Sequence, residues 1–197
     1  TKINKVKEII NKTKTSKIQI GYKFGLEFIN SKKGRGFISK LKGKIIFLDL
    51  KLNDIPNTCI STIKAVKDLK TNYITIHISS GLEALKAAKK ISGRTKIVGV
   101  STLTSLNEKS LKEIGYDKKL NSLVTHQAKL ARKANLDGIV CSSHEIKTVR
   151  KIVGNDLIIV VPGIRPNNHL TKYDDQKRFM TPEKAIEYGA DFSRWCS

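Results

Sequence analysis

FLDLKLNDIPNT, residues 47–58, joins the end of an apolar run to a polar segment that opens a helical pattern. A near-continuous run of large apolar residues is typical of a strand that is buried on both faces of a parallel sheet. Asp49 and Lys51 are two residues apart, so on a strand their side chains point to the same face. Asp54 follows in the loop. The stretch therefore predicts a buried parallel strand with charged side chains at its carboxyl end.

The same alternation repeats along the whole chain. Short apolar runs predict strands, and longer segments with a period of three to four residues predict helices. Strand–helix units in series are typical of an α/β fold with a parallel sheet. No Gly-x-Gly-x-x-Gly pattern follows a predicted strand, so a dinucleotide-binding fold is not favoured. The predicted strands are residues 19–24, 44–50, 72–77, 95–101, 138–141 and 156–161, and the predicted helices are residues 3–12, 60–69, 82–91, 123–134, 144–153 and 182–188.

The number of these units points to one particular α/β architecture. A (β/α)8 barrel typically needs about 250 residues, and this chain of 197 residues supplies six or seven of the eight units. No linker or shift in composition divides the chain. We therefore predict a single domain over residues 1–197, a TIM barrel that is incomplete at both termini.

Composition limits the classes of partner and location. Hydrophobic residues make up 39% and charged residues 28%, a soluble globular balance. No apolar run reaches the roughly 18 residues of a membrane span, and no signal-peptide core is present, so we expect no membrane contact. Three scattered cysteines favour neither a disulfide framework nor a zinc site and fit a reducing cytoplasm, where we expect the protein.

The net charge of +21 is the most unusual property of the sequence. Such a charge suggests nucleic acid or an anionic surface as a partner. The lysines are spread along the whole chain, however, and aromatic residues make up only 6%, which is poor for stacking on bases. We therefore predict no nucleic-acid partner, but an electrostatic field that attracts an anionic ligand.

Polar residues follow several predicted strands, where a barrel places its active site. Asp49, Lys51 and Asp54 form an acid–base–acid group that could move or stabilise a proton, although a structural ion-pair network has the same pattern. Lys23 and His77 lie at the ends of two other predicted strands. A further polar residue, Thr104, follows the strand predicted at residues 95–101.

The segment Gly163-Ile164-Arg165-Pro166 follows the last predicted strand. Barrels often bind phosphate there, with loop N–H groups and a nearby helix N-terminus. Arg165 could hold phosphate oxygens bidentately. A surface arginine in a turn is the alternative.

Together these segments resemble the bacterial orotidine 5'-phosphate decarboxylases, in the order that this family uses. The resemblance spans roughly residues 19 to 192. The Asp-x-Lys-x-x-Asp pattern alone is shared with sugar-phosphate decarboxylases and hexulose-phosphate synthases. Its continuation Ile-Pro-Asn-Thr, combined with Gly-Ile-Arg-Pro, is specific. The matching segments are YKFGLEF (22–28), DLKLNDIPNT (49–58), ITIHISSG (74–81), STLTS (101–105), LDGIVCSSHE (136–145), VPGIRP (161–166) and DDQKRFMTPEKAIEYGAD (174–191).

The resemblance implies decarboxylation of orotidine 5'-phosphate to UMP, without a cofactor or a metal, by a homodimer with shared sites. It implies that Lys51 delivers a proton to pyrimidine carbon 6 after carbon dioxide leaves, that Asp49 lies near the departing carboxylate and that Lys23 contacts the ribose region. The resemblance further implies that Asp54 and Thr58 enter the neighbouring subunit's site, that Thr104 meets the pyrimidine, that Arg165 and Gln176 hold the phosphate, and that Ile55 and His77 also contact the substrate.

Two departures from the family keep alternatives open. The family's first strand, with an aspartate that touches the ribose, is expected before Thr1. After Phe192 the family continues into an apolar eighth strand that ends in Gly-Arg, whereas this chain reads Ser-Arg-Trp-Cys-Ser, and Arg194 does not match the phosphate-binding arginine. The alternatives are a related phosphate-binding barrel, such as a sugar-phosphate decarboxylase or synthase with metal ligands near Asp49, and an inactive truncated fragment or basic binding protein.

Overall fold

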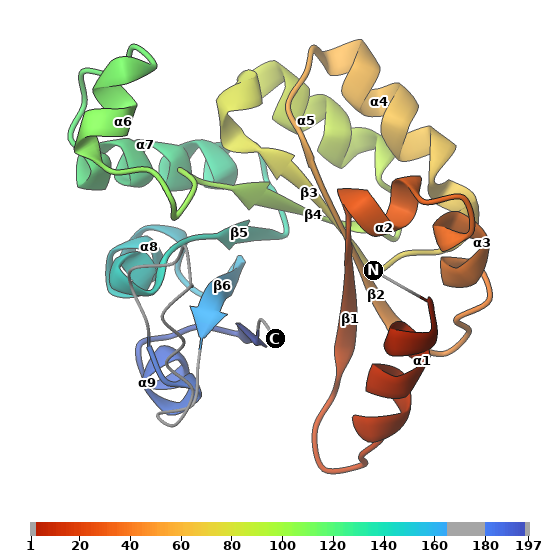
Figure 1. The fold of residues 1–197 in the computed structure, drawn as a ribbon. Coiled ribbons are helices and arrows are strands. Elements are labelled where there is room, and N and C mark those ends of the chain that lie inside the picture. The colour runs from red at the N-terminus through yellow and green to blue at the C-terminus, as the bar shows by residue number, and fades with distance from the viewer. Residues whose placement is uncertain (1–2, 165–179, 196–197) are drawn as a thin grey trace.

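Seven parallel strands form one sheet in chain order in the computed structural model, which describes residues 3–164 and 180–195 (Figure 1). Each strand pairs in parallel with the next one along the chain. Helices connect successive strands and lie on the outer side of the sheet, which confirms the predicted α/β barrel architecture. The strands are β1 (Gly21–Gly25), β2 (Ile45–Leu52), β3 (Tyr73–His77), β4 (Lys96–Val100), β5 (Gly138–Val140), β6 (Ile158–Ile164) and β7 (Phe192–Trp195).

The helices match the segments with three-to-four-residue periodicity, and three shorter ones add to them. Thr181 caps the last helix by accepting the Lys184 N–H, and Pro182 occupies its first turn, as the sequence predicts. The α-helices are α1 (Ile3–Lys12), α2 (Leu26–Asn30), α3 (Gly34–Ile38), α4 (Pro56–Ala65), α5 (Gly81–Ile91), α6 (Glu108–Glu113), α7 (Leu120–Lys133), α8 (Ile146–Val153) and α9 (Pro182–Glu187), with single 3-10 turns at Lys67–Leu69, Ile78–Ser80 and Ser143–Glu145.

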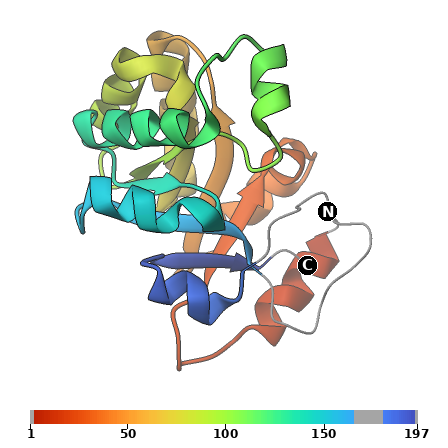
Figure 2. The ribbon, with the colours of Figure 1, turned by 90° about the vertical axis from the view of Figure 1, so that its left-hand side faces the viewer.

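The sheet curls but does not close in the part of the chain that the structure describes. Its outer strands are β1 and β7, and no ladder joins them within residues 3–164 and 180–195 (Figures 1 and 2). The strand β7 was not among the predicted strands, and it pairs in parallel with β6. Its sequence FSRW is neither an apolar run nor an end in Gly-Arg, so the departure from the family's eighth strand stays a prediction. A further strand beside β1 stays a prediction.

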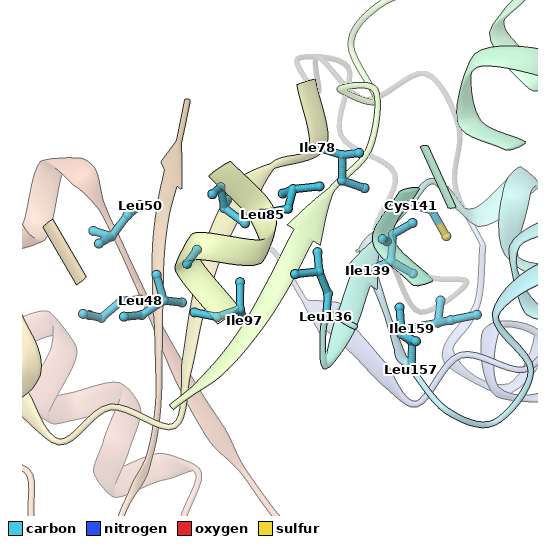
Figure 3. Packing of buried hydrophobic residues seen from close by; sticks show 14 of the residues in the cluster. Leu48, Leu50, Ile78, Leu85, Ile97, Leu136, Ile139, Cys141, Leu157 and Ile159 are labelled. Atoms are coloured by element: carbon cyan, nitrogen blue, oxygen red, sulfur yellow. The ribbon is translucent and has the colours of Figure 1, made fainter. Parts of the chain in front are cut away.

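The main core lies between the sheet and the helices. Leu48, Ile97, Ile139 and Ile159 come from β2, β4, β5 and β6 and are fully buried (Figure 3). Leu85 of α5 packs in the same layer, where it covers the sheet. Burial of such side chains stabilises a fold by roughly 1.5–3 kcal/mol each. This layer fixes the strands whose carboxyl ends carry the site.

Aromatic rings connect the two sides of the curled sheet. The ring centroids of Phe47 and Tyr73, on neighbouring strands β2 and β3, lie 5.4 Å apart in a stacked arrangement. Phe192 of β7 meets Tyr73 edge-on, with centroids 5.8 Å apart. Since β3 and β7 are far apart in the sheet order, this contact must cross the inside of the curl. Ring packing therefore helps to hold β7 near β3, whereas no ladder links β7 to β1 among the residues that the structure describes.

One kind of hydrogen bond, from a backbone N–H to a side-chain oxygen, recurs before every second strand at the amino-terminal edge of the sheet. Asn72, Asp137 and Asp191 each come just before a strand, β3, β5 or β7. A side-chain oxygen of each accepts a backbone N–H from the preceding strand, from Ile46, Ile97 and Ile159 respectively, at 2.7–2.8 Å.

Cations complete this arrangement at two of the three positions. Lys89 of α5 pairs with Asp137 at 2.6 Å. Arg150 of α8 pairs with Asp191 and donates to the carbonyl oxygens of Gly154, Leu157 and Gly189 as well. The acidic residues here are therefore satisfied by backbone groups and a single cation each.

Candidate active site

One buried carboxylate lies between two lysine ammonium groups at the carboxyl ends of β1 and β2. The Asp49 side chain is 7% exposed, and its Oδ2 atom accepts hydrogen bonds from the Nζ atoms of both Lys23 and Lys51. The distance from Lys51 Nζ to Asp49 Oδ2 is 2.7 Å. The side chains of Lys23 and Lys51 are 21% and 39% exposed, so both are more accessible than the carboxylate that they contact.

The electrostatics of this group keep the carboxylate ionised. Burial by itself raises the pKa of the Asp49 carboxyl, but the charge and hydrogen bond of Lys23, followed by those of Lys51, outweigh it and hold the pKa below its usual value. Asp49 is therefore negatively charged at neutral pH, and with two ammonium groups beside it the cluster carries one net positive charge.

An irregularity in β2 brings the Lys51 side chain to this position. The pairing of β2 with β3 shifts register between Leu48 and Leu52, and Lys51 has a left-handed backbone with φ of 47°. Such a conformation costs a non-glycine residue roughly 1–2 kcal/mol, and bulges of this kind recur beside active sites. Asp49 and Lys51 meet as predicted, but through a bulged strand and not through regular alternation alone.

Thr75 of β3 supports the bulge and was missed by the sequence analysis. Its hydroxyl oxygen accepts the backbone N–H of Lys51 at 2.8 Å, and the hydroxyl donates to Asp49 Oδ1 at 3.1 Å. The sequence does mark Thr75, as a polar residue between Ile74 and Ile76 inside an otherwise apolar predicted strand.

His77 ends β3 beside the charged cluster. It is half-buried, and this burial lowers the pKa of its imidazole. The positive charge of Lys51 lowers that pKa further, whereas the negative charge of Asp49 opposes the shift. His77 is therefore neutral at pH 7. The influence of both charges on its pKa agrees with the prediction that His77 lies at the same edge of the sheet as Asp49 and Lys51.

The next predicted site residues lie beyond the cluster, in the loop after β2 and on α4. Asp54 is exposed, and its Oδ1 atom accepts the backbone N–H of Ile55 at 2.7 Å. Ile55 is 66% exposed, and Thr58 is exposed on the first turns of α4. Among the described residues, Asp54 forms no ion pair with Lys51. A single chain thus leaves this acidic group facing outward, and its predicted role in a neighbouring subunit stays a prediction.

The remaining predicted residues are spread over the two loops that follow β4 and β6. Thr104 lies in the turn after β4 and is half-buried. Arg165 and Gln176 lie outside the described residues, so their predicted phosphate contacts stay predictions. Within residues 3–164 and 180–195, no three His, Cys, Asp or Glu side chains come together as a metal site. The choice between the decarboxylase and the sugar-phosphate alternative, which requires metal ligands near Asp49, stays a matter for experiment.

A sequence profile of the Orotidine 5'-phosphate decarboxylase / HUMPS family matches residues 1–193. The chain belongs to this family. This membership confirms the resemblance that the motifs at Asp49 and Gly163 suggested.

Members of the family from several bacteria align with most of the chain. The orotidine 5'-phosphate decarboxylase of Wolbachia pipientis subsp. Culex pipiens (strain wPip) is 44% identical over 173 residues, which cover 86% of this chain and 75% of that protein. The enzyme of the same name from Carboxydothermus hydrogenoformans is 41% identical over 181 residues, 87% of this chain and 74% of its own length.

A solved structure of the family has the same fold. The crystal structure of orotidine 5'-phosphate decarboxylase from Lactobacillus acidophilus superimposes with a TM-score of 0.79 at 31% identity, covering 97% of this chain and 84% of that one. An uncharacterized protein from Geobacillus kaustophilus gives the same TM-score at 27% identity, with 96% of this chain and 84% of that chain covered.

The described helices include none long and apolar enough to cross a bilayer.

Proposed function

We propose that this member of the family decarboxylates orotidine 5'-phosphate to UMP. The observation that carries the proposal is the placement of Lys51 Nζ 2.7 Å from the buried, ionised Asp49 at the carboxyl edge of the sheet. Barrels place their catalytic residues at this edge. Family membership and the names of the relatives support the same reaction.

The chemistry requires a cation at the reacting carbon. When carbon dioxide leaves carbon 6 of the pyrimidine, the electron pair of the broken C–C bond stays on that carbon as a carbanion. A fixed ammonium group stabilises this charge in a site shielded from water. We assign that role to Lys51, which then transfers a proton to carbon 6 and becomes a neutral amine. Asp49 orients Lys51 and lies close to the departing carboxylate, while Lys23 completes the charge array.

Binding energy away from the reacting ring supports this chemistry. By resemblance to the family, we assign the substrate phosphate to Arg165 and Gln176, and the pyrimidine to Thr104, with His77 and Ile55 as further contacts. Interactions with a remote phosphate can be used to hold the reacting group in position. The net charge of +21 also favours the approach of an anionic nucleotide.

The direct test is to add orotidine 5'-phosphate to the purified chain and to follow its ultraviolet absorbance while UMP is quantified separately. We expect absorbance to fall as UMP appears in equal amount. Activity that is lost on chelation and regained with a divalent ion would favour the sugar-phosphate alternative, since we propose that no metal or organic cofactor is needed. A folded chain that forms no UMP would be the inactive fragment.

We also propose a homodimer with shared sites. Support comes from the exposure of Asp54, Ile55 and Thr58, which follow Lys51 closely in the chain. Lys51→Ala and Asp54→Ala proteins should each be inactive, and a mixture of them should regain activity because one hybrid site is intact. If subunit exchange is verified by mass and no activity returns, the sites are not shared.

A cytoplasmic location agrees with the composition and stays a prediction. Fractionation of cells that express the untagged chain would test it.

A further inference from the structure

Thr75 is the most completely buried polar side chain next to the charged cluster, with 1% of its surface exposed. Its single hydroxyl makes two hydrogen bonds to different parts of the cluster. The oxygen accepts the Lys51 backbone N–H at 2.8 Å, and the hydrogen is donated to Asp49 Oδ1 at 3.1 Å. One hydroxyl on β3 thus joins the main chain of one charged residue to the side chain of the other.

The bulge in β2 explains why a hydroxyl is needed there. In a regular ladder the Lys51 N–H would donate to a backbone carbonyl of β3, but the register shift between Leu48 and Leu52 interrupts that pairing. A partly buried N–H without an acceptor is costly. The Thr75 oxygen supplies the acceptor and so supports the left-handed backbone of Lys51.

The hydrogen bond from the Thr75 hydroxyl to Asp49 fixes the orientation of the Asp49 carboxylate. Asp49 Oδ2 receives both lysine ammonium groups, and Oδ1 receives the Thr75 hydroxyl. Fixing Oδ1 limits rotation of the carboxylate and keeps Oδ2 directed at Lys51 Nζ. A valine has nearly the same shape as threonine but can make neither of these two bonds.

We propose that Thr75 is a positioning residue for the decarboxylation, an inference that rests on the proposed function. Thr75 acts through Lys51 and Asp49 and does not itself contact the reacting ring. Its hydroxyl sets the direction of the ammonium group that stabilises the carbanion. Misplacement of a catalytic group by even about 1 Å can cost a hundredfold in rate, so loss of the hydroxyl should lower kcat more than it weakens nucleotide binding.

The experiment compares Thr75→Val with Thr75→Ser in steady-state decarboxylation and in calorimetric titration with UMP. For Thr75→Val we expect kcat to fall about ten- to a hundredfold, because the variant loses the hydrogen bond to the Asp49 carboxylate and the one from the Lys51 backbone N–H. The Kd for UMP should change less than about threefold. Thr75→Ser keeps the hydroxyl and should retain kcat within about threefold of the wild type.

Thr95→Val is the matched control at the opposite edge of the sheet. The Thr95 hydroxyl joins the segments that precede β4 and β3 by donating to the Thr71 carbonyl oxygen at 3.0 Å, and it lies at the other edge of the sheet from Asp49 and Lys51. Its kcat per folded molecule, with folding measured by urea denaturation, should equal that of the wild type. If Thr75→Val does not fold, Thr75→Cys replaces it, because a thiol keeps the volume with weak hydrogen bonds. We then expect a kcat at least about fivefold below the wild type.

The outcomes separate this inference from the proposed function. An active wild type, an inactive Lys51→Ala and a Thr75→Val (or Thr75→Cys) with unchanged kcat would overturn only the role of Thr75. Equal losses in Thr75→Val and Thr75→Ser would also overturn it, because they would indicate side-chain packing and not the hydroxyl. An inactive wild type would overturn the proposed function and the role of Thr75 with it.

Discussion

The two edges of the sheet use the same residue types for different purposes. At the amino-terminal edge, Lys89 pairs with Asp137 at 2.6 Å, and at the carboxyl-terminal edge Lys51 pairs with Asp49 at 2.7 Å. The two ion pairs are nearly identical in length. They differ in what else each carboxylate binds.

The second partner of the carboxylate separates the two edges. Asp137 also accepts the backbone N–H of Ile97, so its charge serves the strand ladder. Asp49 accepts a second ammonium group and a hydroxyl, and the side chains of its two lysines are 21% and 39% exposed. An acid–base pair in a parallel sheet is thus structural when main-chain groups saturate it, and is available for chemistry when other side chains do.

The largest expected effect comes from removing the lysine of the ion pair at the carboxyl-terminal edge. Lys51→Ala should reduce kcat at least about a thousandfold, because it removes the cation that stabilises the carbanion and supplies the proton. The Kd for UMP should change little. Lys89→Ala is the matched control and should keep kcat, with a loss of unfolding free energy of at most about 1 kcal/mol.

Decarboxylation assays and urea denaturation of both variants measure this contrast. Near wild-type turnover in Lys51→Ala, or a comparable loss of kcat in folded Lys89→Ala, would contradict the division between the edges.

A smaller effect is expected from removing the aspartate at the amino-terminal edge. Asp137→Ala should lower the unfolding free energy by about 1–2 kcal/mol, because the Ile97 N–H and Lys89 both lose their acceptor at a partly exposed position. The kcat per folded molecule should not change. Asp137→Asn can still accept the Ile97 N–H and should lose less stability, so a loss equal to that of alanine would assign the effect to the ion pair instead.

The smallest effect concerns pH. The pKa of Asp49 is lowered in the folded protein, so the ionised carboxylate stabilises the fold above its ordinary pKa of about 4 and this contribution is lost as pH falls further. Below about pH 4 the wild type should lose at most about 1.4 kcal/mol per pH unit from this single group. Asp49→Asn should lose less over the same range.

Denaturation of the wild type and Asp49→Asn between pH 3 and 7 checks the sign. Equal acid sensitivity of the two proteins would show that Asp49 is not held ionised by its lysines. Because Asp49 stays charged near neutrality, we also expect no change in kcat from its titration between about pH 5 and 8.

Much of the fold follows from local patterns. The helix predicted at residues 3–12 is α1, and all six predicted strands are present with ends shifted by at most three residues. The short helices α2, α3 and α6 were not predicted, because five or six residues are too few to show a helical period. The strand β7 was missed since its pairing with β6 depends on the backbone and not on apolar side chains.

The grouping of three charged side chains was predictable, but their geometry was not. Spacing and resemblance together pointed to Lys23, Asp49 and Lys51, which the fold brings together. The left-handed backbone of Lys51 arises from the register of two strands, which no local sequence pattern encodes. Thr75 stands out in the sequence only as a polar residue between Ile74 and Ile76, and its two hydrogen bonds to the cluster depend on that irregular pairing.

The side-chain oxygens that accept backbone N–H groups before β3, β5 and β7 have a consequence for hydrogen exchange. Amides near strand ends usually exchange early, because the ends fray. Here the amides of Ile46, Ile97 and Ile159, each next to the first residue of its strand, donate to the side chains of Asn72, Asp137 and Asp191. These three amides should therefore exchange as slowly as those in the middle of the sheet, which makes the amino-terminal rim as resistant to local opening as the core above it.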